Sequence, residues 1–290
     1  MKKGIDIGGT FVKVFWEDGT REKHYIKELS KDRQAFLTKV REIALSGEPE
    51  AVGVAVAGFT STEGVVYRSP NIPALDGVNL RELFKGLKVK VVNDVSAGAY
   101  GEWFYEHRDS KVLLFVAIGT GLGGGLVVEG RPFLGACGCS LELGHHTIRV
   151  GGERCSCGRL GCWEAYCSSY GLERTYQRLS GETLKDFHIV QRALQGEPYA
   201  LKAVQEFKEH LLTGLMNAVH LFNPDRVVLG GGLIDLMAGL LEGLEEELKA
   251  TCESLPAKCL RLFFSRCAEY CMARGALALS LTDDTQAKLA

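Results

Sequence analysis

Net charge, long apolar runs and runs of like charge are all nearly absent from this sequence. Lysine and arginine total 34 against 36 for aspartate and glutamate, so the formal net charge of −2 gives no electrostatic argument for binding nucleic acid or an acidic membrane. No stretch approaches the roughly 18 consecutive apolar residues of a membrane-spanning helix, and no signal-peptide pattern follows Met1. We therefore expect a cytoplasmic protein whose partners are small molecules, not nucleic acid or membranes.

Cysteine, in contrast, is abundant: there are ten, and six fall in one segment. With 290 residues, of which 46% are apolar, the chain is long enough for a large core, and two domains are the natural expectation. A disulfide framework fits small secreted domains, which this chain does not resemble. Clustering favours a metal site instead. The six clustered cysteines are Cys137, Cys139, Cys155, Cys157, Cys162 and Cys167.

The hydrophobic pattern mixes short buried strands with amphipathic helices, which predicts an α/β architecture. Strands are expected over residues 3–7, 12–16, 24–26, 51–57, 89–92, 111–118, 126–128, 226–229 and 260–264. Helices are expected over residues 32–45, 79–84, 96–106, 164–179, 184–195, 198–221, 233–251 and 269–281. Both halves begin with a strand, a glycine turn and a strand, so we expect a structural repeat between them.

Three glycine-rich turns, at residues 6–10, 119–125 and 230–232, follow predicted strands. Glycine permits positive φ and lets backbone N–H groups approach a phosphate closely. Asp6, at the end of a buried strand, is suited to holding Mg²⁺ through water, and Thr10 adds a hydroxyl. Each turn taken alone is equally well interpreted as a tight hairpin turn. None is followed by the Gly-Lys-Ser/Thr of a Walker A motif.

A histidine and three cysteines have the spacing of a zinc site. His145 is followed by Cys155, Cys157 and Cys162, and three thiolates with one imidazole complete a tetrahedral zinc. A site closed by four protein ligands is structural, not catalytic. Gly158 and Gly161 would let the chain turn tightly around the metal. Alternatives remain open: His146 competes with His145, the rival cysteines are Cys137, Cys139 and Cys167, and the group could be buried free thiols.

These motifs together resemble the ROK family of bacterial sugar kinases and sugar-responsive repressors, and within it the glucokinases. The resemblance covers essentially the whole chain. Residues 6–10 with Lys13 resemble the family's first phosphate loop, and Asn93-Asp94 its catalytic pair. Residues 142–145 resemble its Glu-x-Gly-His signature, and residues 155–164 resemble its zinc motif, which is the most specific of the four.

The resemblance implies two ribonuclease-H-like domains, of the kind found in actin and hexokinase, with an interdomain cleft. The expected small domain comprises residues 1–107 plus 268–290, and the large domain residues 108–267 with the zinc site. The last helix is expected to return to the N-terminal domain. ATP, Mg²⁺ and a structural Zn²⁺ are the implied cofactors, and a homodimer is the implied assembly.

Carried over residue by residue, the resemblance makes Asp94 the general base that takes the proton from the sugar 6-hydroxyl. The implied sugar ligands are Gly58, Asn71, Asn93, Asp94, Glu142, His145 and Glu164. The implied contacts to ATP and Mg²⁺ are Asp6, Gly8, Gly9, Thr10, Lys13, Gly119, Thr120, Gly121, Gly123, Gly231 and Gly232. Simpler roles compete for three of these residues: Asp94 as a helix N-cap, Glu164 as an acidic first-turn residue and Lys13 as a strand-surface lysine.

Glucose is the expected substrate, with other hexoses or N-acetylhexosamines (N-acetylmannosamine, N-acetylglucosamine, fructose, allose) as alternatives. Two departures bear on this choice: Ser140-Leu141 stand where the family has Ala-Gly, and Phe59 stands where it often has proline. Polyphosphate could replace ATP as donor. A repressor carries an N-terminal helix-turn-helix domain, for which a phosphate loop at residue 6 leaves no room, so we expect an enzyme. An actin-like ATPase with an iron-sulfur cluster would not explain the Glu-x-Gly-His signature.

Overall fold

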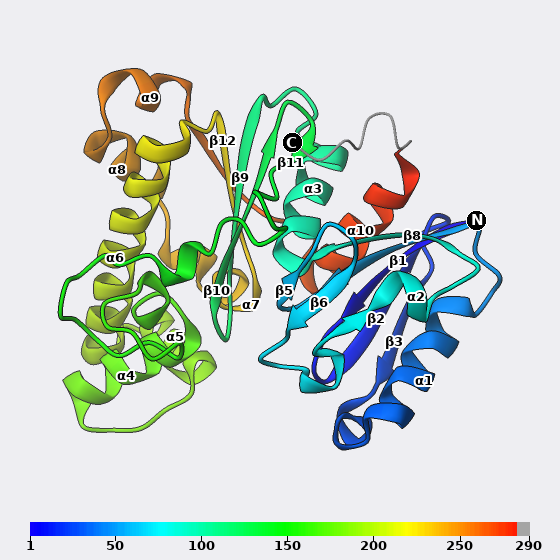
Figure 1. Cartoon of the computed structure of the whole chain (residues 1–290). Helices are drawn as coiled ribbons and strands as arrows, with labels where there is room; N and C mark the ends of the chain where they lie inside the picture. Colours follow the sequence, from blue (N-terminus) through cyan, green and yellow to red (C-terminus); the bar gives the residue numbers. More distant parts are fainter. Residues whose placement is uncertain (283–290) are drawn as a thin grey trace. The chain divides into compact units, whose positions relative to one another are not determined.

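The computed structural model describes residues 1–282, which divide into two compact units (Figure 1). Among the described residues, unit 1 comprises Met1–Lys111, Gly125–Leu141 and residues 269–282, and unit 2 comprises Val112–Gly124 and Glu142–Ala268. The last part of the expected small domain, residues 283–290, lies outside the described residues. No helix among the described residues combines the length and apolar character needed to cross a membrane.

Unit 1 is built on a five-stranded sheet of order β3-β2-β1-β4-β8. The first three strands pair antiparallel, and β1, β4 and β8 pair parallel. A second small sheet has the order β5-β6-β7. The bounds are β1 Lys2–Ile7, β2 Phe11–Trp16, β3 Arg21–Tyr25, β4 Ala51–Val56, β5 Phe59–Thr60, β6 Val65–Arg68, β7 Val78–Asn79 and β8 Lys88–Asn93.

Helices cover both faces of this sheet because alternate residues of a strand point to opposite faces. Ile5 belongs to the same buried cluster as Phe36 and Val40 of α1, which packs on one face. On the other face, a Cβ atom on Gly4 would lie 2.0 Å from the Ala273 carbonyl oxygen of α10. Glycine thus lets α10 sit directly on the sheet, and the last helix returns to unit 1 as the resemblance implies. The bounds are α1 Arg33–Leu45, α2 Leu80–Leu83, α3 Asp94–Glu106 and α10 Cys271–Leu281.

The second five-stranded sheet has the order β11-β10-β9-β12-β13, which repeats the order of the first: third, second, first, fourth and fifth strand along the chain. Strand β12 pairs parallel with β9 and with β13. The predicted structural repeat and the α/β fold class are therefore confirmed. The bounds are β9 Val112–Ile118, β10 Leu122–Val128, β11 Arg131–Pro132, β12 Arg226–Gly230 and β13 Arg261–Phe264.

Unit 2 contains the remaining α-helices and four of the six clustered cysteines, Cys155, Cys157, Cys162 and Cys167. The longest helix, α6, begins after Glu197, whose carboxylate accepts hydrogen bonds from the first-turn N–H groups, and it ends at Asn223 with φ +47°. The bounds are α4 Ser169–Ser180, α5 Asp186–Leu194, α6 Pro198–Phe222, α7 Gly232–Met237, α8 Leu244–Thr251 and α9 Ser254–Cys259. The 3-10 helices are η1 Lys27–Lys31, η2 Pro73–Leu75, η3 Leu143–His145, η4 Trp163–Ala165, η5 Ala238–Leu240 and η6 Ala268–Tyr270.

Two predicted helices have the wrong bounds. The helix expected from residue 164 begins only at Ser169, because the Ser168 hydroxyl caps it by accepting from the Gly171 N–H. The single helix expected over residues 233–251 is broken into α7, η5 and α8. Gly243, with φ +76°, precedes α8, and this left-handed backbone cannot continue a helix.

Candidate functional site

The carboxyl ends of three parallel strands bring the first predicted residues together in unit 1. Ile7 of β1 pairs with Val56 of β4, and Val56 pairs in turn with Asn93 at the end of β8. Parallel strands end at one edge of a sheet, so Asp6, Gly58 and Asn93 gather at that edge. This edge is where the sequence places the phosphate loop and the catalytic pair.

Asn93 caps helix α3, and Asp94 is the first helical residue. The Asn93 side-chain oxygen accepts from the N–H groups of Val95 (2.9 Å) and Ser96 (3.2 Å), while its Nδ2 donates to the Gly58 carbonyl at 3.2 Å. The interpretation of Asp94 as the N-cap is therefore wrong, because Asn93 is the N-cap of α3.

Gly58 must be glycine for steric reasons. Its φ is +130°, and a Cβ atom there would lie 2.5 Å from the Arg68 carbonyl oxygen and 2.9 Å from the Ser69 Cα. Its own carbonyl receives the Asn93 amide at 3.2 Å. The Gly58 carbonyl therefore fixes the side chain of Asn93, the residue before Asp94.

Asp6 and Asp94 form a pair of half-buried carboxylates with raised pKa values. Burial, then the negative charge of Asp94, raises the pKa of Asp6 to about 7, with Lys13 opposing the rise. Lys13 lies directly across from Asp6 on β2. Burial also raises the pKa of Asp94, although hydrogen bonds from the backbone and from Asn93 oppose it. A half-buried carboxylate that disfavours ionisation, with a second half-buried carboxylate close enough to raise its pKa further, is a donor set that a divalent cation would satisfy.

The first glycine turn is closed by a hydrogen bond from the Gly8 N–H to the Phe11 carbonyl at 3.0 Å. Thr10 is exposed. A Cβ atom on Gly9 would lie 2.9 Å from the Asn71 carbonyl oxygen, so the predicted residues Gly9 and Asn71 lie side by side. The Lys13 ammonium donates to the Glu269 carbonyl at 2.8 Å, which ties it to the chain just before α10.

The second glycine turn, in unit 2, is shorter than the sequence suggests. It spans residues 119–121 and is closed by a 2.9 Å bond from the Gly119 N–H to the Gly121 carbonyl. Gly123 lies in β10. Gly125, also in β10, packs against α3, where a Cβ atom would lie 2.6 Å from the Ala99 Cβ. The expectation of one continuous turn over residues 119–125 is therefore wrong, because its last three glycines belong to a strand.

The third glycine turn begins helix α7. Gly231 has φ +96°, and a Cβ atom there would lie 2.4 Å from the Ile118 carbonyl oxygen at the end of β9. Gly232 is the first residue of α7, with open space where its Cβ would be. The positive φ and the close Ile118 carbonyl thus require glycine at position 231. At Gly232 no other group occupies the space beside the first residue of the helix.

His145, Cys155, Cys157 and Cys162 converge on one point in unit 2. Their ligand atoms all lie within 4.8 Å of one another. The Cys155 Sγ lies 3.6 Å from the His145 Nδ1, and the Cys157 Sγ lies 3.7 Å from the Cys162 Sγ. A tetrahedral zinc with Zn–S and Zn–N bonds of usual length separates two sulfurs by about 3.8 Å and a sulfur from a nitrogen by about 3.5 Å. The donor set therefore fits zinc.

The pKa values of the clustered thiols also favour a bound cation. Burial alone would raise the pKa of Cys157, but hydrogen bonds from Arg159 and the neighbouring thiols lower that pKa to about 6. Burial and the hydrogen bonds to Cys157 and Cys155 raise the pKa of Cys162 to about 12. Three thiols this close cannot all ionise unless a cation compensates their charge.

The rival ligands are not part of this cluster. The His146 Nδ1 faces the Leu143 carbonyl at 2.5 Å, and its ring lies edge-on to Trp163. The buried thiol of Cys167 donates to the Phe207 carbonyl. Cys137 and Cys139 belong to unit 1. Gly158 and Gly161 have φ of +88° and +77°, so the predicted tight turns of the loop are confirmed.

Glu164 links the metal cluster to the second glycine turn. It is only 7% exposed. Its Oε2 accepts from the Leu122 N–H at 3.0 Å, and its Oε1 accepts from the Ser156 hydroxyl at 2.6 Å and the Tyr170 hydroxyl at 3.2 Å. A Cβ atom on Gly121 would lie 2.7 Å from the Glu164 Oε2. The glycine at 121 therefore makes room for this carboxylate, and Glu164 is more than a first-turn acid.

Ser156 and Tyr170 were missed by sequence reasoning. Ser156 stands between two metal-ligand cysteines, and Tyr170 lies in the first turn of α4. Neither has a spacing signal of its own, because their role follows from where the folded loop places Glu164. Glu164 contacts Leu122, Ser156 and Tyr170 only because the folded chain brings these separate segments together.

Glu142 and Leu141 lie where the Glu-x-Gly-His signature begins. The Glu142 carbonyl accepts from the His145 N–H at 2.9 Å and so starts η3, with the Glu142 residue itself exposed. Leu141 has φ +57°, in the left-handed region that favours glycine and costs another residue about 1–2 kcal/mol. The position where the resemblance leads one to expect glycine therefore keeps the glycine conformation with a leucine side chain.

Comparison with known proteins decides the family. The model of the ROK family matches residues 2–283. The chain belongs to the ROK family. The resemblance of the sequence motifs to the ROK family is thereby confirmed, and the four-residue metal cluster agrees with the zinc motif that this resemblance implies.

Three relatives of this ROK protein illustrate its neighbourhood. An N-acetyl-D-glucosamine kinase of Pectobacterium atrosepticum is 35% identical over 256 residues, covering 80% of this chain and 84% of the relative. A kanosamine kinase of Amycolatopsis mediterranei is 33% identical over 88% of this chain and 90% of its own. The structure of a ROK family glucokinase from Streptomyces griseus in complex with glucose and AMPPNP superposes with a TM-score of 0.79 at 25% identity, covering 96% and 98% of the two chains.

Proposed function

We propose that this ROK protein is an ATP-dependent hexokinase-type kinase that phosphorylates the 6-hydroxyl of a hexose, with Asp94 as the general base. The observation that carries the proposal is the carboxylate pair of unit 1, in which the pKa of Asp94 and that of Asp6 are both raised. A general base works best when its pKa is close to the working pH. Such raised pKa values are typical of functional carboxylates.

In the proposed reaction, Asp94 accepts the hydroxyl proton while the sugar oxygen attacks the γ-phosphorus and the bond to the β-phosphate oxygen breaks. Asn93 positions Asp94 by capping α3. Asp6 would hold Mg²⁺ through water, and Lys13, beside it, would favour the ionised carboxylate. Mg²⁺ supplies neutralisation of phosphate charge when it is bound. ATP is the proposed donor, with polyphosphate as an alternative.

The proposed ATP contacts are the three glycine turns. They comprise Gly8, Gly9, Thr10 and Lys13 in the first, Gly119, Thr120, Gly121 and Gly123 in and after the second, and Gly231 and Gly232 in the third. The hydroxyl of Thr10 and the open side of Gly232 support this part of the proposal.

Zn²⁺ is the proposed occupant of the cluster, held by His145, Cys155, Cys157 and Cys162 in a structural role. When bound, it would supply the positive charge that three adjacent thiolates require. The His145 Nδ1 faces the cluster at 3.6 Å from the Cys155 sulfur, so the other ring nitrogen is the one available to a sugar hydroxyl.

Glucose is the proposed sugar, with glucose derivatives that carry an amino or acetamido group as the first alternatives. The names of the compared relatives support this range, because each specifies glucose or an amino derivative of it. N-acetylmannosamine, fructose and allose complete the range. The proposed sugar contacts are Gly58, Asn71, Asn93, Asp94, Glu142, His145 and Glu164. We also propose a cytoplasmic homodimer, with domains at residues 1–107 plus 268–290 and at 108–267.

An ADP-release assay over a sugar panel tests the function. The panel contains glucose, N-acetylglucosamine, kanosamine, N-acetylmannosamine, fructose and allose, each with Mg-ATP and with polyphosphate. We expect turnover with at least one glucose-configured sugar, and the highest kcat/KM for glucose. Absence of turnover with every sugar and both donors would rule out the kinase proposal, whereas preference for an acetamido sugar would only replace glucose.

A further inference from the structure

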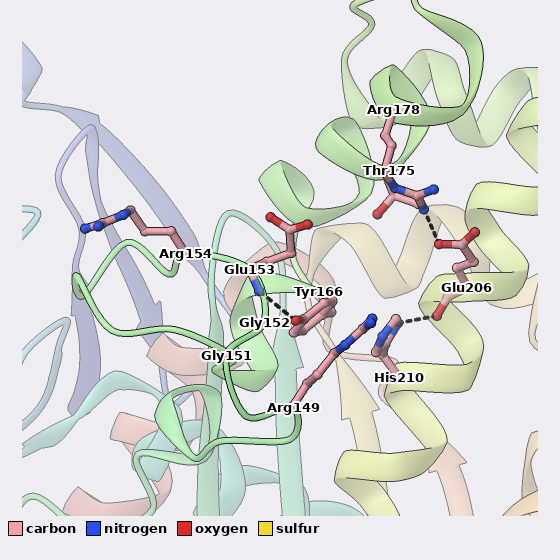
Figure 2. Close-up of a pocket in the computed structure, with 10 residues that line it drawn as sticks. All are labelled: Arg149, Gly151, Gly152, Glu153, Arg154, Tyr166, Thr175, Arg178, Glu206 and His210. Atoms are coloured by element: carbon pink, nitrogen blue, oxygen red, sulfur yellow. Dashed lines mark hydrogen bonds and ion pairs between the residues drawn. The ribbon is translucent and has the colours of Figure 1, made fainter.

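Unit 2 contains a cavity, separate from the cluster ligands, that the proposed reaction does not use. It has a volume of about 550 Å³, and its lining residues come from the loop between His145 and Cys155, from Tyr166 at the end of η4, and from helices α4 and α6. This volume lies within the range of small-molecule pockets. Figure 2 shows the lining side chains, among them Arg149, Tyr166 and His210.

The cavity gathers donors suited to an anion. Figure 2 shows the Arg149 side chain directed toward His210, and within residues 1–282 its guanidinium has no ion-pair partner. Arg178 lines the same cavity, paired with Glu206. Tyr166 accepts a hydrogen bond from the Glu153 N–H at 2.8 Å, which leaves its own O–H free to donate. Arginine is the side chain best shaped for phosphate oxygens.

The same cavity also offers acceptors and a rigid wall. The carboxylates of Glu153 and Glu206 line it and can accept hydrogen bonds from hydroxyl groups. The rings of Tyr166 and His210 are stacked, with centroids 4.3 Å apart and planes at 15°. The His210 Nδ1–H donates to the Glu206 carbonyl at 2.7 Å, which fixes the ring orientation. A ligand with one anionic group and several hydroxyls matches this combination better than a lone phosphate.

We propose that this cavity is a binding site for a sugar phosphate, with the phosphate on Arg149 and Tyr166 and the sugar hydroxyls on the two glutamates. This is also the chemical class of the product of the proposed reaction. The binding itself requires no catalysis, so it stands or falls separately from the kinase proposal.

The test follows the ring resonances of His210 by NMR, assigned with His210→Gln, during titration of the full chain with glucose 6-phosphate. Inorganic phosphate and glucose are the comparison probes. We expect a saturable shift with glucose 6-phosphate and weaker binding of either comparison probe. The shift should persist in Asp94→Asn, because a product bound only at the proposed catalytic residues would not move His210.

Arg149→Ala is expected to weaken binding about tenfold or more, the effect of one charge-assisted hydrogen bond. Lys202→Ala is the control: it removes a positive charge from an exposed position of α6 that does not line the cavity, and we expect at most about a threefold change. Circular dichroism and metal content verify that Arg149→Ala is folded. Equal losses in both variants, no shift of His210, or equal binding of inorganic phosphate would each overturn the proposal.

Discussion

Replacing Glu164 with alanine should destabilise unit 2 and weaken binding of the zinc proposed for its cluster. The carboxylate accepts from Leu122 N–H, Ser156 hydroxyl and Tyr170 hydroxyl at 3.0, 2.6 and 3.2 Å, and the residue is 7% exposed. A hydrogen bond to a charged group contributes about 1.5–3 kcal/mol. The Leu122 N–H would be left without its acceptor, and a small cavity would form. Because such contributions are not additive, we expect a total loss of about 3–5 kcal/mol.

For a folded unit of this size, 1 kcal/mol lowers the Tm by roughly 2–4 °C, so the expected drop is on the order of 10 °C. Differential scanning calorimetry measures it, and atomic emission measures zinc per chain, which should fall because Ser156 lies between two ligand cysteines. Glu209→Ala, at an exposed position of α6, is the matched control and should change stability by at most about 0.5 kcal/mol. A Glu164→Ala protein with unchanged Tm and an unchanged zinc content would refute the role of Glu164 in linking the cluster to the second glycine turn.

Three further predictions concern the metal, a glycine and a carboxylate. Removal of the proposed zinc with a chelator should lower both the Tm, measured by calorimetry, and the affinity for the sugar, measured by titration. If neither the Tm nor the sugar affinity changed, the structural role proposed for the cluster would be wrong. Gly58→Ala should destabilise unit 1 by about 2–4 kcal/mol, since its Cβ would lie 2.5 Å from the Arg68 carbonyl oxygen at φ +130°, and chemical denaturation would contradict this if stability were unchanged. Asp6→Asn should raise stability without Mg²⁺ at pH 8 by up to about 4 kcal/mol, because burial and Asp94 raise the pKa of Asp6 from 3.8 to about 7. Between about pH 4 and 7 the folded wild type binds a proton at Asp6 that the unfolded chain does not bind. The destabilisation of the folded state by Asp6 therefore grows as the pH rises through that window and is absent below it. An increase in the free energy of unfolding of Asp6→Asn that is the same at pH 4 and pH 8 would contradict this explanation.

The elements with strong periodicity could be predicted from the sequence. Helix α6 was predicted within a residue of its ends, and the strands β9 and β12, which lead into the second and third glycine turns, were found because nearly all of their residues are apolar. The breaks were harder to predict. Helix α4 starts after Ser168 and not at Glu164, because residues 163–167 are buried in a part of the chain that is not α-helical and that follows the cysteine cluster. Gly243 interrupts a segment whose hydrophobic spacing is helical throughout.

The candidate site divides in the same way. The convergence of His145 with Cys155, Cys157 and Cys162 was predicted from their spacing, which had left one other histidine and three other cysteines open as rivals. The role of Asp94 does not follow from spacing: the local pattern fits a helix cap equally well, and only the folded structure assigns the cap to Asn93 and brings Asp94 close enough to raise the pKa of Asp6. Glu164 was predicted as a sugar ligand, and its contacts with Leu122 and Tyr170 depend on tertiary packing that no local pattern encodes.

The central claim is that Asp94 is the base of a sugar kinase, and Asp94→Asn tests it most directly. The amide keeps the shape of the side chain but cannot accept the hydroxyl proton. Asp32→Asn, at the N-cap of α1, is the control, because asparagine caps a helix as well as aspartate does. With the preferred sugar and Mg-ATP, we predict that Asp94→Asn binds sugar normally while kcat falls by about 10²- to 10⁴-fold, and that Asp32→Asn keeps its kcat. A near-normal kcat in Asp94→Asn would contradict the account.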